Sequence, residues 1–121
     1  MVAYLRQALW PRAALAVACA LIIAWGSLMP GEELPENLPW DKFNHFIGYA
    51  GLAFWVRLAG PGGGGSFLIA AGYGVLIELA QIGVPGRSGG DWEDILANSL
   101  GALSAVVLVA LWQRRGDSLK E

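Results

Sequence analysis

Four long apolar runs, separated by short polar connections, dominate the pattern of this sequence. They predict helices over residues 9–29, 42–59, 66–84 and 94–112. Each run is close to the roughly 20 residues that a helix needs to cross about 30 Å of hydrocarbon. The alternative is a water-soluble bundle, but helices this apolar lack the polar face that such a bundle needs. The pattern therefore predicts an all-α integral membrane bundle of four transmembrane helices, a single domain over residues 1–121.

The three connections are rich in proline and glycine. They cover residues 30–39, 60–65 and 85–90, and such residues end helices and form turns. The first apolar run is longer than the roughly 7–15-residue hydrophobic core of a secretory signal peptide. We therefore expect residues 9–29 to be a retained first crossing.

The charges differ between the two ends of the predicted bundle. With four crossings, one end receives Arg6, Arg12, Arg57, Arg114, Arg115 and Lys120. The other end is acidic around residues 32–36 and 91–94. Positive charge favours the cytoplasmic side of a membrane. We therefore predict a multi-pass protein of the plasma (inner) membrane, with both termini in the cytoplasm.

Composition narrows the chemistry further. The chain is 55% hydrophobic with a formal net charge of −2, and it has no basic stripe for nucleic acid. The single cysteine, Cys19, leaves no disulfide framework. The single histidine, His45, lacks the partner spacing of a zinc site. We expect no metal, cofactor or nucleic acid, but a membrane lipid as partner; the oligomeric state stays open.

Polar residues lie where three of the predicted helices approach the outer surface. They are Asp41, Lys42, His45 and Tyr49 on the second helix, Glu78 and Gln81 on the third, and Asp91, Asp94 and Asn98 on the fourth. Ionisable groups at membrane depth are costly and usually functional. The spacing therefore predicts one shared, outward-facing polar pocket, although Asp41 and Asp91 can instead cap their helices.

Acid–base chemistry is the reactive interpretation of these residues. His45, Glu78 and Asp94 are the candidate catalytic groups, because histidine changes charge near neutral pH. The structural alternative for Glu78 is an ion pair, and we predict that it contacts Lys42, His45 or Arg87. Ser88 lies in a glycine-rich loop without the turn of a nucleophile elbow, so a catalytic triad is weakly supported.

The order of the polar motifs resembles the VanZ-like family. The motifs are D-K-x-x-H-F-x-x-Y from Asp41, E-x-x-Q from Glu78, P-G-R-S from Pro85 and D-x-x-x-N-x-x-G from Asp94. The resemblance covers residues 41–101, and the first helix matches only as an apolar segment.

Two features depart from the family pattern. The interval from Arg87 to Asp94 is one residue longer, which leaves open whether Asp91 or Asp94 fills the acidic role. Ala105 also stands where a further glycine often falls.

The resemblance implies a small bacterial membrane protein. The founding member of the family is linked to resistance to the glycopeptide teicoplanin, without an established biochemical activity. By this resemblance, the polar residues that match the family pattern are the candidate ligand-binding residues. They are Asp41, Lys42, His45, Tyr49, Glu78, Gln81, Arg87, Asp94 and Asn98.

We therefore expect an envelope protein that binds a lipid-linked or anionic headgroup ligand, such as a lipid-linked envelope precursor. Lys42 and Arg87 would be the cationic contacts, since arginine suits phosphate and carboxylate recognition. One alternative is a membrane enzyme that acts on an envelope lipid, with His45 and Glu78 as acid and base. Another is a small proton-coupled transporter. The resemblance also suggests a link to glycopeptide resistance.

Overall fold

A computed structural model describes residues 2–33, 41–87 and 89–120, and every element within them is helical. The elements are α1 (Val2–Leu28), the short 3-10 helix η1 (Gly31–Glu33), α2 (Asp41–Leu58), α3 (Gly63–Gln81) and α4 (Trp92–Ser118). The all-α prediction with four helices is confirmed.

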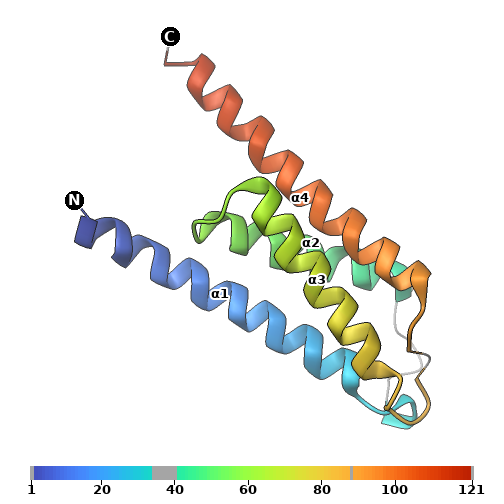
Figure 1. The fold of residues 1–121 in the computed structure, drawn as a ribbon. Coiled ribbons are helices and arrows are strands. Elements are labelled where there is room, and N and C mark those ends of the chain that lie inside the picture. Colours follow the sequence, from blue (N-terminus) through green and yellow to red (C-terminus); the bar gives the residue numbers. More distant parts are fainter. Residues whose placement is uncertain (1, 34–40, 88, 121) are drawn as a thin grey trace.

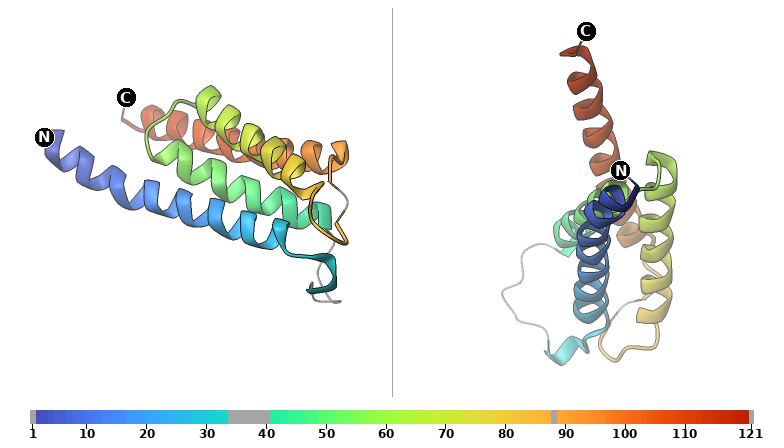
Figure 2. Two further views of the ribbon diagram at one scale, coloured as in Figure 1. Left: turned by 60° about the horizontal axis from the view of Figure 1, so that its bottom comes forward. Right: turned by 90° about the vertical axis from the view of Figure 1, so that its left-hand side faces the viewer.

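The four long helices alternate in direction, so the bundle has two different ends (Figure 1). Both termini and the α2–α3 turn lie at one end, which we call the termini end. η1, the start of α2, the end of α3 and the start of α4 gather at the other, which we call the η1 end (Figure 2). α2 packs against all three other long helices, whereas α1 contacts only α2 and α3 among the described helices. The three polar segments of the sequence therefore share the η1 end.

The helix bounds differ from those predicted. α1 begins at Val2 and α4 continues to Ser118, beyond the predicted ends at residues 9 and 112. Apolarity set the predicted bounds, but arginine and glutamine are good helix formers and continue a helix after the apolar run ends. α3 instead stops at Gln81, before the predicted end at residue 84.

Three of the described helical segments are long and apolar enough to cross a membrane: Leu9–Leu28, Gly63–Gln81 and Trp92–Ser118. α2 is not among them. It has 18 residues and includes Asp41, Lys42 and Arg57. Four crossings and cytoplasmic termini therefore stay predictions.

Small residues bring the helices close together. Ala53, Ala70 and Ala102 are completely buried. A Cβ atom at Gly101 of α4 would overlap the backbone oxygen of Phe46 in α2. Close approach of this kind is the usual way in which helices associate without a hydrophobic driving force. Gly101 therefore fixes the distance between α2 and α4 just inside the η1 end.

The first and third connections also touch each other. The Gly31 backbone N–H donates to the Pro85 carbonyl at 3.0 Å. Gly86 has a φ of +72°, in the left-handed region that favours glycine, and a Cβ at Gly31 would overlap the Gly86 carbonyl. The two connections are therefore held side by side at the η1 end.

Candidate functional site

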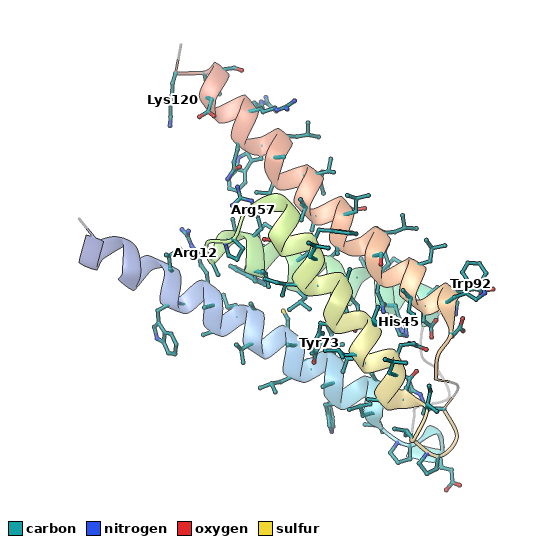
Figure 3. The ribbon with its side chains drawn as sticks, viewed as in Figure 1. Arg12, His45, Arg57, Tyr73, Trp92 and Lys120 are labelled. Carbon is teal, nitrogen blue, oxygen red and sulfur yellow. The ribbon has the colours of Figure 1, made fainter. Side chains whose placement is uncertain are left out.

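Polar side chains from three helices meet at the η1 end, and Figure 3 shows His45 there, close to the start of α4. We call this set the polar site; it comprises Lys42, His45, Tyr49, Glu78, Asp91, Glu93, Asp94 and Asn98. Its interior is closed, because His45, Glu78, Asp94 and Asn98 are each no more than 9% exposed. Lys42, Asp91 and Glu93 form its exposed edge, with side chains 22%, 31% and 58% exposed. The polar site is thus a packed polar core with an acidic edge.

Lys42 is held by the start of α4. Its ammonium lies 2.5 Å from Asp94 Oδ1, 3.3 Å from Asp91 Oδ2 and 3.9 Å from Glu93 Oε2. Acidic residues are favourable in the first turn of a helix, where the macrodipole is positive. Lys42 therefore partly offsets the charge of a carboxylate cluster that the helix start itself favours, and it joins α2 to α4.

His45 lies between an amide and a carboxylate. Its Nδ1 is 2.9 Å from Asn98 Oδ1, and its Nε2 is 3.9 Å from Asp94 Oδ2. An Nδ1–H donor to the amide oxygen satisfies the first contact. Nε2 then faces the carboxylate, with which the ring forms an ion pair when it is protonated. This arrangement orients the imidazole for proton transfer at Nε2.

Glu78 organises the segment that enters α4. Its Oε1 accepts a hydrogen bond from the Asp91 backbone N–H at 2.9 Å, and its own carbonyl accepts one from the Gly90 N–H at 3.1 Å. Glu78 thus binds backbone N–H groups of the α3–α4 connection. The predicted contact with a basic side chain stays a prediction.

Three buried polar atoms of the polar site have no hydrogen-bond partner among the described residues: Tyr49 Oη, Glu78 Oε2 and Asn98 Nδ2. Gly74 of α3 lies against two of these side chains. A Cβ there would lie 3.0 Å from Asn98 Nδ2 and 3.1 Å from the Tyr49 ring, and Glu78 follows four residues later on the same face of α3. Two donors and one acceptor are therefore buried in the packed core of the polar site, where an unpaired group costs about 1–3 kcal/mol.

Gln81 and Arg87 bind the end of α1 instead of the centre of the polar site. Gln81 Nε2 donates to the Ser27 carbonyl at 2.8 Å. Arg87 Nη1 donates to the Gly26 and Met29 carbonyls at 3.3 and 3.4 Å. The last carbonyls of a helix have no partner within it, and a cation there is favourable. Arg87 thus caps α1, a role that the sequence analysis did not consider.

The structure separates the two aspartates at the start of α4. Asp91 is the N-cap: its Oδ1 accepts from the Glu93 backbone N–H at 2.9 Å, as the capping alternative predicts. That hydrogen bond, and then the Lys42 ammonium, lower the Asp91 pKa below its ordinary value. Asp94 lies deeper, between Lys42 and His45. The geometry therefore places Asp94 in the interior acidic position.

One predicted residue, Asp41, cannot be placed in the site: it begins α2, but its side chain lies outside the described part of the structure. Ser88, the residue of the disfavoured triad, also lies outside the described residues. Within the described residues, no group of three or more histidine, cysteine, aspartate or glutamate side chains is arranged to hold a metal ion.

Sequence reasoning missed two contributors to the polar site. Glu93 belongs to its acidic edge, and its position in the first turn of α4 was an available signal. Gly74 makes room for Tyr49 and Asn98. A glycine four residues before a buried glutamate in an apolar helix is the signal that could have identified it.

The fold and the polar site define a small all-helical membrane protein with a buried polar cluster at one end. A family model described as VanZ/LLP1 matches residues 4–113. The match covers most of the chain, so the protein belongs to the VanZ/LLP1 family, and the match extends the resemblance into α1. No curated protein and no solved structure matches the chain.

Proposed function

We propose that this protein binds a lipid-linked ligand of the bacterial cell envelope at the polar site, with the η1 end facing outward from the plasma membrane. One observation carries the proposal: α2, α3 and α4 bring costly polar groups to the same end of an apolar bundle. The buried His45, Asp94 and Asn98 would orient the exposed edge, and Lys42, Asp91 and Glu93 would contact the headgroup.

The charge balance favours a headgroup rich in hydroxyl or ammonium donors. Lys42 already faces three carboxylates, and Arg87 is bound to the end of α1. A phosphate would have to displace a carboxylate from Lys42, whereas Asp91 and Glu93 can accept hydrogen bonds from donors directly. This proposal replaces the expectation of an anionic headgroup contacted by Lys42 and Arg87.

Lipids that remain bound during purification test the proposal. The variant Asp91→Asn/Glu93→Gln removes the acidic edge but keeps an N-cap, because asparagine also caps helices. Asp117→Asn, in the exposed tail of α4, is the matched control. Mass spectrometry should find an envelope lipid on the wild type and the control and lose it from the double variant. Equal retention by all three proteins would refute the proposal.

A membrane enzyme is the second candidate function. The observation in its favour is the position of His45, whose two ring nitrogens face Asn98 and Asp94. Such a histidine can act as a general acid or base near neutral pH. The test is turnover of an envelope lipid extract by the purified protein. Turnover by the wild type that is lost in His45→Gln, with unchanged thermal stability, would establish the enzyme.

The link to glycopeptide resistance is a separate proposal. Expression of the chain in a teicoplanin-susceptible bacterium should raise the inhibitory concentration of teicoplanin. The Asp91→Asn/Glu93→Gln variant should not raise it if resistance requires the polar site. An unchanged susceptibility with the wild-type protein present in the membrane would remove resistance from its functions.

A further inference from the structure

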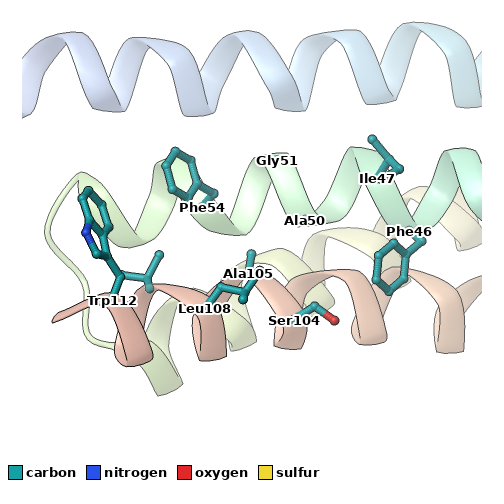
Figure 4. Close-up of a pocket in the computed structure, with 10 residues that line it drawn as sticks. Phe46, Ile47, Ala50, Gly51, Phe54, Ser104, Ala105, Leu108 and Trp112 are labelled. Atoms are coloured by element: carbon teal, nitrogen blue, oxygen red, sulfur yellow. The ribbon is translucent and has the colours of Figure 1, made fainter. Parts of the chain in front are cut away.

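A groove of about 650 Å³ runs between α2 and α4, below the polar site (Figure 4). We call it the α2–α4 groove. Its volume lies in the range of about 300–1,000 Å³ that is usual for ligand sites. Its lining comprises Phe46, Ile47, Ala50, Gly51 and Phe54 of α2, and Ser104, Ala105, Leu108, Val109 and Trp112 of α4.

The lining is apolar along its length. Ser104 is its polar residue, and the Ser104 hydroxyl donates to the Leu100 carbonyl at 2.8 Å, within its own helix. Small residues such as Ala50 and Gly51 alternate with the bulky rings of Phe46 and Phe54. The groove can therefore hold a hydrocarbon but offers little to a polar ligand.

The groove begins close to the exposed edge of the polar site along α2. Phe46 follows Lys42 by four residues and so neighbours it on the surface of α2. The groove thus begins one helical turn from Lys42 along α2, and the Lys42 ammonium binds Asp94 across the junction with α4. A single amphiphilic molecule could reach both the edge and the groove.

The length of the groove suits a segment of a hydrocarbon chain. The lining spans eight residue steps on each helix, which corresponds to about 12 Å of helix axis. α4 is long and apolar enough to cross a membrane, so the groove lies at a depth where hydrocarbon surrounds the protein. A second copy is the competing occupant: small residues such as Ala50 and Gly51 favour close helix contact, whereas the bulky rings of Phe46 and Phe54 beside them oppose it.

We propose that the α2–α4 groove binds one hydrocarbon chain of a membrane lipid whose headgroup lies on the exposed edge of the polar site. This inference rests on the proposed function and specifies its ligand as an amphiphile bound at two places. The polar edge selects the headgroup, and the groove holds the chain beside it.

Filling the groove tests the proposal. Gly51 lines the groove, and a Cβ there has no atom within 4 Å, so Gly51→Leu adds a side chain at an open position of the groove. Gly72→Leu is the matched control, because Gly72 of α3 is equally open and does not line the groove. Each protein is reconstituted in vesicles of phosphatidylethanolamine and phosphatidylglycerol, released in mild detergent and weighed by native mass spectrometry.

The wild type and Gly72→Leu should each retain a lipid, and Gly51→Leu should lose it. A phosphatidylglycerol with a diazirine in its acyl chain should also crosslink to the groove segments of α2 and α4, and Gly51→Leu should abolish those crosslinks. Retention and crosslinking in Gly51→Leu equal to those of the control would overturn the inference. So would a Gly51→Leu variant that changes only the oligomeric mass, because a second copy would then occupy the groove.

The Asp91→Asn/Glu93→Gln variant in the same assay separates the inference from the proposed function. Lipid lost from that variant but kept by Gly51→Leu would preserve headgroup binding and refute the groove. Lipid lost from Gly51→Leu but kept by the acidic-edge variant would support the groove and refute the headgroup assignment.

Discussion

The two ends of the bundle both carry charged residues, but they use them differently. At the termini end, Arg12 donates to the Leu58 carbonyl at 3.3 Å, and Arg57 donates to Gln113 Oε1 at 3.1 Å, in exposed contacts (Figure 3). At the η1 end, Lys42 binds carboxylates beside a closed interior that includes Asp94. The exposed charges of the termini end suit orientation in a membrane, whereas the charges of the η1 end are packed against one another at a helix junction. Only the second arrangement resembles a functional site.

The largest expected effect concerns the side of the membrane that each end faces. In a Cys19→Ser background, Glu33→Cys and Ser88→Cys should react with an impermeant thiol reagent in intact cells, and Gly63→Cys should not. The reason is the excess of positive charge at the termini end. Labelling at Gly63 alone would reverse the orientation of the two ends.

The next effect compares one cation from each end. Lys42→Ala leaves Asp94 buried with its main partner removed, a change that costs up to about 3–5 kcal/mol when a pair is fully buried. The partial exposure of Lys42 makes the loss smaller than that limit. Arg57→Ala, at the termini end, should cost about 0–1 kcal/mol. Thermal unfolding in detergent measures both, and Asp94→Asn should restore much of the stability lost in Lys42→Ala. Equal losses from the two cations would remove the contrast between the ends.

A smaller effect on stability is expected where Gly74 packs against Asn98 and Tyr49 in the polar site. Gly74→Ala would press a methyl group against Asn98 and the Tyr49 ring, at a cost of about 1–3 kcal/mol for overpacking. Gly72→Ala has open space and should stabilise α3 by up to about 1 kcal/mol through helix propensity. Opposite shifts in melting temperature would confirm tight packing at the η1 end. Similar shifts for both variants would show that this core is loose.

The smallest effect is acid sensitivity at the N-cap of α4. The Asp91 pKa is lowered in the folded protein by the hydrogen bond from the Glu93 N–H and by Lys42. Its contribution to stability is therefore complete above the ordinary value of 3.8 and is lost as the pH falls through the lower folded pKa. Asp91→Ser keeps a capping oxygen but does not titrate, so its melting temperature should fall less between pH 5 and pH 2 than that of the wild type. An identical fall would exclude Asp91 from the acid response.

The sequence was sufficient to predict the helices, because apolar runs of membrane length have few other interpretations. It also predicted which segments share the η1 end, since alternating helices place the starts of α2 and α4 beside the end of α3.

The partner of each side chain was harder to predict. Lys42 and Arg87 were paired in the sequence analysis as cationic ligand contacts, yet one binds α4 and the other the carbonyls of α1. Spacing along a helix gives the face of a residue, whereas its partner depends on the rotation and distance of the neighbouring helix. Gly74 and Gly101 determine how closely the neighbouring helices approach, and this effect is visible only in the packed bundle.

The hydrogen bonds to the part of α1 nearest the η1 end have a consequence for how its sequence can change. Tyr73 donates to the Ala20 carbonyl at 2.5 Å, Gln81 to that of Ser27, and Arg87 to those of Gly26 and Met29. In each bond α1 supplies a main-chain oxygen, which every amino acid possesses. In these hydrogen bonds the side-chain specificity therefore resides in α3 and in the connection that follows it, so a substitution in α1 that keeps its packing against α2 leaves the bonds in place.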